Sequence, residues 1–272
     1  MTDITGLIDP HIHAAPEHIP RLLDDISLAR QAQEAGMAGI MIKSHTTLTA
    51  DRATIARSVV PGIQVWGGLV LNDATGGVNP STVENAIVYG ASEIWMPTLD
   101  AANHKHHYGQ GPGGLSLESA ELPEAIRQIL ELIAEKDLIL GTGHLSTSEI
   151  LRLIPAARSQ GVRKILITHP EAPFVDMPIS VQQELAGLGC FFERTWVFTT
   201  PALGEVLTAD HLTQAIHEVG IESTVLATDM GQVGNPTPVE GLQAYVGACL
   251  GAGFSQEEIK RMGARNILEW LE

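Results

Sequence analysis

Cysteine is scarce in this sequence. Only two cysteines occur among 272 residues, Cys190 and Cys249. No disulfide framework is therefore expected, and a reducing cytoplasm is the expected compartment. The start MTDITGLID also lacks the basic and apolar regions of a signal peptide. Neither thiol is expected to act as a nucleophile, because Cys190 begins a predicted strand and Cys249 lies in the apolar segment LQAYVGACL, where burial keeps a thiol protonated.

Long hydrophobic runs and an excess of basic residues are missing as well. No stretch of about 18 apolar residues occurs, so no membrane span is expected. Acidic residues number 32 against 16 basic ones, and the net charge of −16 repels the phosphates of nucleic acids and of anionic lipids. With 44% hydrophobic and 18% charged residues, the chain is not of the disordered class. We expect a small-molecule partner, no nucleic acid and no membrane, and we leave self-association as a homo-oligomer open.

Short apolar runs rich in Val, Ile and Leu alternate with longer amphipathic stretches along the chain. Each run is bounded by Gly, Pro or a polar cluster, which is typical of strands in β/α units. The runs cover residues 6–13, 39–45, 64–71, 93–99, 138–144, 164–169, 189–197 and 224–230. The stretch 100–114, DAANHKHHYGQGPGG, is rich in Gly and polar residues and is predicted to be a loop.

Eight alternating units in a chain of this length predict one α/β domain over residues 1–272, a (β/α)₈ or TIM barrel. A doubly wound open sheet ranks second. An open sheet that binds a dinucleotide has a Gly-rich phosphate-binding motif after its first strand, and this sequence has no such motif there.

Histidines and one aspartate gather at the ends of four of these runs. In a (β/α)₈ barrel the catalytic groups lie at the C-terminal ends of the strands. The first run ends IDPHIH, and since strand side chains alternate, His11 and His13 point to one side. Runs five, six and eight end at His144, His169 and Asp229. A lone histidine is more often structural than a ligand, but five such residues at four strand ends predict a shared metal site.

The order H-x-H, His, His and Asp on strands one, five, six and eight resembles that of the amidohydrolase superfamily of metal-dependent hydrolases. The ending MGARNILEWL looks like the Asn-containing C-terminal helix of many members. The resemblance implies that His11, His13 and Asp229 bind the more buried metal, and that His144 and His169 bind the more exposed one. It also implies one or two divalent ions per chain, with Zn²⁺ expected and Mn²⁺, Fe²⁺ or Ni²⁺ as alternatives.

The fourth run departs from the superfamily pattern. Many members place there a Lys modified by CO₂, or a Glu, that bridges two metals, whereas EIWMPTLD ends without either. Lys43 closes the second run, and in some members the bridging ligand comes from strand two. We expect a carbamate on Lys43 to bridge a binuclear centre. The alternative is an unmodified Lys43 that holds a substrate carboxylate or an oxyanion, with a single metal.

Three further residues are predicted to contact substrate. His45 lies two residues beyond Lys43 and therefore on the same side of its strand. Arg194 could clamp an anionic group with its planar guanidinium, or it could equally form a structural ion pair with Glu193 or with a neighbouring helix. His104 lies in the loop after the fourth run, where barrel enzymes place substrate lids. The alternative for His104 is a solvated loop.

The expected activity is hydrolysis of an ester, lactone or amide bond in a small molecule. A divalent ion lowers the pKa of its water to about 7 and so provides a hydroxide nucleophile. By the resemblance, Asp229 is the proton shuttle between this nucleophile and the leaving group. The alternatives are a decarboxylating lyase of the same superfamily, a phosphoesterase and a metal-binding barrel without turnover. The phosphoesterase is disfavoured because no cluster of Arg and Lys surrounds these strand ends.

Overall fold

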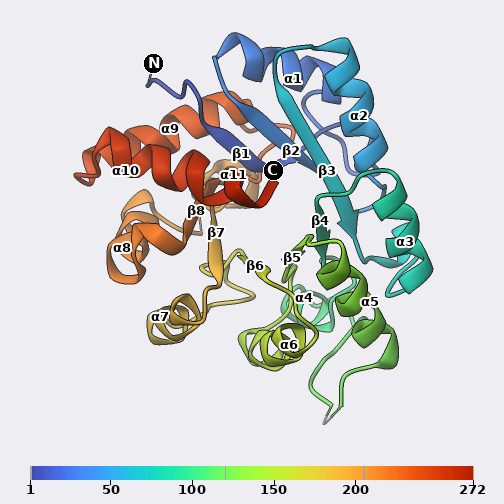
Figure 1. Cartoon of the computed structure of the whole chain (residues 1–272). Coiled ribbons are helices and arrows are strands. Elements are labelled where there is room, and N and C mark those ends of the chain that lie inside the picture. The colour runs from blue at the N-terminus through green and yellow to red at the C-terminus, as the bar shows by residue number, and fades with distance from the viewer. Residues whose placement is uncertain (1, 120, 205, 272) are drawn as a thin grey trace.

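Eight parallel strands form a barrel in chain order. The computed structural model describes residues 2–119, 121–204 and 206–271. The sheet order runs from β1 to β8, and β8 returns to β1 through hydrogen bonds that join Asp229 N to His11 O and His13 N to Met230 O (Figure 1). The strands are β1 (Ile8–His13), β2 (Gly39–Lys43), β3 (Gln64–Val70), β4 (Glu93–Trp95), β5 (Ile139–Gly141), β6 (Lys164–Thr168), β7 (Phe191–Thr195) and β8 (Thr224–Ala227). The predicted (β/α)₈ barrel is confirmed.

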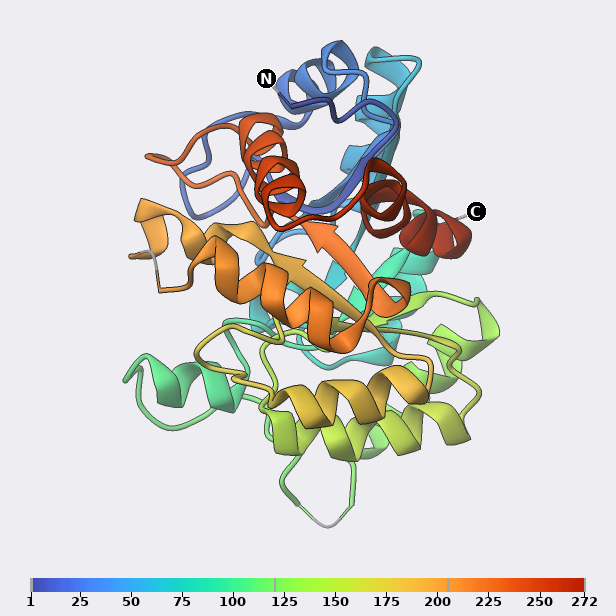
Figure 2. The ribbon, with the colours of Figure 1, turned by 90° about the vertical axis from the view of Figure 1, so that its left-hand side faces the viewer.

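Helices cover the outside of this barrel (Figure 2). They are α1 (Asp25–Glu34), α2 (Ala50–Val59), α3 (Pro80–Val88), α4 (Ala102–His107), α5 (Glu124–Glu135), α6 (Thr147–Ser159), α7 (Ile179–Gly187), α8 (Ala209–Val219), α9 (Pro238–Gly251), α10 (Gln256–Lys260) and α11 (Asn266–Leu271). Capping boxes at Ser146, Thr237 and Ser255 fix where α6, α9 and α10 begin. None of the helices in the described part of the chain has the length and apolar character needed to cross a membrane.

Alternation along the strands separates the barrel interior from the side that faces the helices. On β2, Ile40 and Ile42 pack in the layer under the helices, while Met41 belongs to the interior cluster. That cluster is apolar and lies inside the barrel: Ile8, Met41, Trp66, Val70, Trp95, Ile139, Leu166, Val225 and Ile267. The side chains that could bind a metal lie at the C-terminal ends of the strands.

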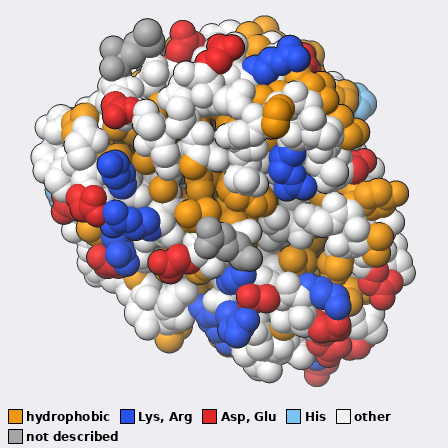
Figure 3. Space-filling view, turned by 45° about the horizontal axis from the view of Figure 1, so that its top comes forward, with side chains coloured by type: hydrophobic (Ala, Val, Ile, Leu, Met, Phe, Trp, Pro, Cys, Tyr) orange, Lys and Arg blue, Asp and Glu red, His pale blue; other side chains and the backbone are white. Residues whose placement is uncertain are grey.

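The outer surface carries charges of both signs. Over the face in Figure 3, acidic and basic side chains are interspersed, and very little histidine is visible. By contrast, the histidines at the ends of the strands are buried, with His11 at 0% and His169 at 2% exposure. The histidines that could bind a metal are therefore inside the mouth of the barrel.

The loop predicted over residues 100–114 contains a helix, α4, and this prediction is corrected. The amide of Asn103 donates to the carbonyl oxygens of His144 and Phe174, at 3.1 and 2.6 Å. His104 on the same helix is only 7% exposed. Contacts with the loops after β5 and β6 thus order a segment whose composition alone indicates a loop.

Asn266 ties the C-terminal helix to the start of β8. Its amide donates to the carbonyl oxygens of Ile221 and Thr224, both at 2.7 Å, and its side chain is buried. Asn266→Ala would leave these carbonyls without their donor, so we expect the free energy of unfolding to fall by about 1–3 kcal/mol. Denaturant unfolding measures this, with Glu269→Ala on the exposed side of α11 as the control. Equal stability of the two variants would contradict the role of the amide.

Candidate metal centre

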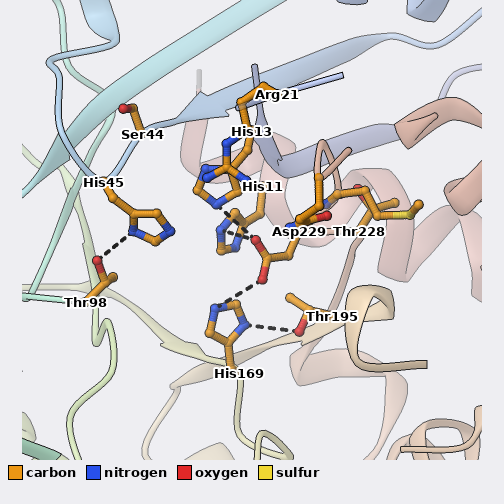
Figure 4. Close-up of polar contacts among 12 residues, drawn as sticks. His11, His13, Arg21, Ser44, His45, Thr98, His169, Thr195, Thr228 and Asp229 are labelled. Atoms are coloured by element: carbon orange, nitrogen blue, oxygen red, sulfur yellow. Dashed lines mark hydrogen bonds and ion pairs between the residues drawn. The ribbon is translucent and has the colours of Figure 1, made fainter. Parts of the chain in front are cut away.

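Three side chains from the two strands that close the barrel converge at its mouth. His11 and His13 end β1, and Asp229 follows β8. Nε2 of His11 and Nε2 of His13 lie 3.1 and 3.0 Å from Oδ1 of Asp229 (Figure 4). Because β8 is the neighbour of β1 in a closed barrel, residues at opposite ends of the sequence meet here.

His169 approaches the same carboxylate from β6. Its Nε2 lies 3.6 Å from Oδ2 of Asp229, and its ring stacks on His11 with 5.1 Å between the centroids. His169 and Asp229 both have left-handed backbone conformations, with φ of 52° and 54°. A non-glycine residue in this conformation costs about 1–3 kcal/mol, and such strain is concentrated at functional sites.

Each of the three imidazoles has an oxygen near its Nδ1. The pairs are His11 with Glu193 Oε1 at 2.5 Å, His13 with Glu17 Oε2 at 3.6 Å and His169 with Thr195 Oγ1 at 3.1 Å. The contacts of His11 and His169 are within hydrogen-bond distance, whereas Nδ1 of His13 has no hydrogen-bond partner in the described part of the chain. An acceptor at Nδ1 keeps the proton on that nitrogen and leaves the lone pair of Nε2 for a metal. Glu193 therefore orients the ring of His11 as that of a metal ligand.

The donor set fits a divalent cation. His11, His13 and Asp229 each offer a ligand atom, and these atoms lie within 4.8 Å of one another. Nε2 of His11 is buried and has no hydrogen-bond partner among the described residues, although Asp229 Oδ1 is 3.1 Å away. The two atoms therefore face a common point rather than each other. Imidazole nitrogens with a carboxylate oxygen suit Zn²⁺ and related ions.

A second group, His13, Glu17 and His45, meets the same distance criterion. The oxygens of Glu17 are already in use, since Oε1 accepts from Ser44 Oγ at 3.0 Å and from His45 N at 2.5 Å, and Oε2 is paired with Arg21. We therefore assign Glu17 to the support of His13 rather than to a metal.

His144 and His45 lie beside the three converging side chains. The rings of His144 and His169 are 5.4 Å apart, and Nδ1 of His144 is 2.8 Å from Nδ1 of His104. His104 on α4 thus contacts one of the predicted ligands directly. His45 stacks on His13 at 4.7 Å, and its Nδ1 is 2.8 Å from Thr98 Oγ1. Both predicted substrate-contacting histidines therefore border the centre.

Lys43 and two carboxylates are buried below the histidines. Lys43 and Glu93 are 0% exposed, and neither Nζ of Lys43 nor the carboxylate of Glu93 has a hydrogen-bond partner in the described part of the chain. Burial lowers the pKa of Lys43, against the opposing effect of Glu193, Asp229 and Glu93. Burial also raises the pKa of Glu93, and the neighbouring Glu193 raises it further. An unpaired amine and an unpaired carboxyl group thus share the barrel interior.

Glu93 has space because the facing strand carries glycine. A Cβ at Gly141 would lie 2.4 Å from Oε1 of Glu93 and 2.3 Å from Trp95. Glu93 begins β4, two residues before the inward-facing Trp95. Because Glu93 is two residues from Trp95, the two side chains face the same side of the strand. A charged residue at an interior position is the sequence feature that could have identified Glu93.

Arg194 lies behind the strands rather than at the mouth. Its side chain is fully buried, pairs with Glu171 and donates from Nε to Thr224 Oγ1 at 3.3 Å. Adjacent residues of a strand face opposite sides, so Glu193 contacts His11 inside the barrel and Arg194 points outward. The structure shows the ion-pair alternative, with Glu171 as the partner instead of Glu193.

Aromatic rings cover the β5 and β6 side of the centre. Phe174 lies 4.6 Å from the ring of His144 and 6.1 Å from the rings of His169 and Phe198, measured between centroids. Tyr108, just after α4, extends this wall at 6.2 Å from Phe174. One side of the mouth is therefore apolar.

Residues 6–193 match a sequence family described as "Family of unknown function (DUF6282)". The chain belongs to this family. No curated protein matches the sequence. Similar solved structures include an amidohydrolase from Pseudomonas aeruginosa, with 12% identity, a TM-score of 0.68 and coverage of 98% of this chain and 95% of that chain.

Two further structures share the barrel. The phosphotriesterase homology protein from Escherichia coli, complexed with phosphate in its active site, has 13% identity, a TM-score of 0.65 and coverage of 99% of this chain and 100% of that chain. A lactonase from Listeria monocytogenes has 11% identity, a TM-score of 0.63 and coverage of 99% and 95%. At these identities the likeness establishes the fold.

Glu193→Gln tests the orientation of His11. The substitution replaces the carboxylate at Nδ1 by an amide of the same shape, and we expect metal affinity to fall about 10- to 100-fold. Competition with a chromophoric chelator measures the affinity. Glu184→Gln, on the exposed side of α7, is the matched control and should bind metal as the wild type does. Equal affinities of the two variants would contradict the assignment.

Metal binding should release a proton from His11. Burial lowers the pKa of His11, but Asp229 and Glu193 outweigh this effect and raise it to about 9 in the metal-free protein. A metal needs the neutral imidazole, so the apparent affinity should rise with pH up to about 9. Calorimetry in buffers of different ionisation enthalpy counts the protons. Binding without proton release near neutral pH would show that His11 is not a ligand.

Proposed function

We propose that the protein is a metal-dependent hydrolase that cleaves an ester, lactone or amide bond of a small molecule. The observation that carries the proposal is the convergence of His11 and His13 on Asp229, with Nδ1 of His11 hydrogen-bonded to the carboxylate of Glu193. The names of the similar barrels, an amidohydrolase and a lactonase among them, support hydrolysis.

The metal would be held by His11, His13 and Asp229, with His169 and His144 as the proposed ligands of a second, more exposed ion. Zn²⁺ is the expected ion, and when bound it would activate a water molecule and polarise the scissile carbonyl. The imidazole nitrogens hold Asp229 in place, and its Oδ2 is directed toward His169 rather than toward His11 or His13.

Asp229 is the proposed proton carrier. Its burial raises the pKa, but the charge of His11 and the close polar contacts with His11 and His13 outweigh this and hold the pKa well below its usual range. The carboxylate is therefore ionised and able to accept a proton from the attacking water. It then delivers the proton to the leaving group, a role that contributes about 10²- to 10⁴-fold to the rate.

The state of Lys43 is linked to the number of metal ions. The charge of Lys43 interacts with the carboxylates of Glu17, Glu93, Glu193 and Asp229. If metal binding ionises Glu93 along with the other three, an ammonium on Lys43, the guanidinium of Arg21 and one divalent ion balance them. A carbamate on Lys43 would instead require two divalent ions. Because uncompensated buried charge is costly, these two combinations are favoured over a carbamate with one metal.

Substitution of Asp229 tests the proposed activity. Zinc-loaded protein should hydrolyse members of a panel of lactones, esters and amides, and removal of the metal by a chelator should abolish turnover. Compared at equal zinc content, because Asp229 is also a proposed ligand, Asp229→Asn should lower kcat by about 10²- to 10⁴-fold, since the amide cannot carry the proton. Ligand affinity of this variant should largely remain. An Asn variant with wild-type turnover would contradict the proton-transfer role, and release of CO₂ in place of hydrolysis would indicate a lyase.

The metal count on Lys43→Ala decides between the two charge arrangements. Elemental analysis of the wild type should give two ions per chain if the lysine is carbamylated, and one if it is an ammonium. Lys43→Ala should then lower the count only in the first case. Two ions retained by the alanine variant would contradict both arrangements.

A further inference from the structure

Arg21 lies beside the candidate metal centre, and the proton transfer proposed above does not use it. Its backbone is fixed to the segment after β8 by an antiparallel bridge to Gln232 and by the adjacent hydrogen bond from Leu22 N to Gly231 O, at 2.9 Å. Figure 4 shows the guanidinium beside the ring of His13. The side chain is only 3% exposed. Arg21 is therefore an almost buried cation held at the mouth.

The guanidinium is engaged at one nitrogen only. Nε donates to Glu17, whereas Nη1 and Nη2 have no hydrogen-bond or ion-pair partner among the described residues. A guanidinium has five N–H donors. The two Nη nitrogens of Arg21 are not among the buried polar atoms that lack a partner, so the small exposed area of this side chain leaves them accessible to a ligand.

Glu17 sets where this fork lies. Its Oε2 contacts Arg21 and is 3.6 Å from Nδ1 of His13, while its Oε1 accepts from Ser44 Oγ and His45 N. One carboxylate therefore holds the guanidinium against the imidazoles of β1 and of the loop after β2. Arg21 therefore lies on the His13 side of the candidate centre (Figure 4).

The other buried cations near the strand ends are differently placed. Arg194 is paired with Glu171 behind the strands, and Arg52 makes a two-point contact with Asp25 through Nε and Nη2. Lys43 lies deeper, over the ring of Trp95. Among these four cations, Arg21 is the one with free donors at the mouth.

The opposite wall is aromatic, as described for Phe174 and Phe198. A ligand that spans the centre would therefore meet a cationic fork at one end and apolar rings at the other. The planar fork matches a carboxylate in a bidentate arrangement. The same fork would also fit a phosphate, and titration with inorganic phosphate distinguishes the two ligands.

We propose that Arg21 binds a carboxylate group of the substrate, so that the natural substrate is a small carboxylic acid. Its ester, lactone or amide bond lies over Asp229, and its apolar body packs against Phe174. This inference rests on the hydrolase function proposed above. Arg21 is thus a specificity-determining residue and takes no part in proton transfer.

Binding of simple acids to the zinc-loaded protein tests this assignment. Benzoate and phenylacetate are titrated by calorimetry beside their neutral counterparts, benzamide and phenylacetamide. The acids should bind at least about tenfold more tightly than the amides. Arg21→Gln should lower the affinity for the acids by about tenfold or more and leave that for the amides unchanged. Arg30→Gln, on the exposed side of α1, should behave as the wild type does.

Arg21→Lys separates the charge from the fork. This variant keeps the cation beside Glu17 and loses the bidentate geometry, so it should retain only part of the affinity for the acids. If a thermal melt shows that Arg21→Gln is not folded, the affinity of Arg21→Lys for the acids tests the proposal instead. Acid affinity unchanged in Arg21→Lys and in any folded Arg21→Gln protein would overturn the proposal, as would a failure of the wild type to bind either acid at millimolar concentration. Tighter, Arg21-dependent binding of inorganic phosphate would also overturn it.

The outcome is distinguishable from that of the hydrolase proposal. If hydrolysis is found and Arg21→Gln raises KM for carboxylated substrates with little change in kcat, both proposals stand. Hydrolysis that is indifferent to Arg21 leaves the activity in place and rejects the carboxylate site. Arg21-dependent binding of the acids without any turnover keeps the site and rejects the activity.

Discussion

The contact between β8 and β1 is the constraint on which the centre depends. Asp229 N donates to His11 O, and His13 N donates to Met230 O, each at 2.8 Å. These backbone bonds close the barrel and, in the same step, place a carboxylate against two imidazoles. The approach is so close that a Cβ at Gly231 would lie 1.9 Å from His13 O. Glycine at this position, with φ of 133°, is therefore a requirement of the closure.

Burial of the ionisable groups below the barrel mouth costs desolvation free energy, and packing does not explain why these groups are there. Lys43, Glu93 and Glu193 occupy a region where apolar side chains would fill the space with less desolvation. Glu193 is explained by its contact with His11, and Lys43 by the carboxylates around it. A bound cation would compensate charges that the metal-free protein leaves unbalanced. We therefore expect these buried groups to lower the free energy of unfolding of the metal-free protein, as active-site residues commonly do.

The strand ends and the pair His11 and His13 were predictable from sequence because their pattern is local. Two-residue spacing fixes which face a side chain takes, and an apolar run fixes where a strand ends. Glu17 and Arg21 were not found, since their roles depend on loops that meet only in the folded chain. From the sequence alone, Glu193 is considered only as one possible partner of Arg194, and the same alternation excludes that pair. The helix α4 was missed because its partners, His144 and Phe174, are distant in sequence.

Anomalous diffraction from crystals of the zinc-loaded protein tests the central claim most directly. The account predicts an anomalous peak at the end of β1, about 2.0–2.2 Å from Nε2 of His11, Nε2 of His13 and an oxygen of Asp229. A second peak beside His144 and His169 would agree with a binuclear centre. Absence of a peak at these atoms in fully loaded crystals, or a peak only elsewhere on the molecule, would contradict the account.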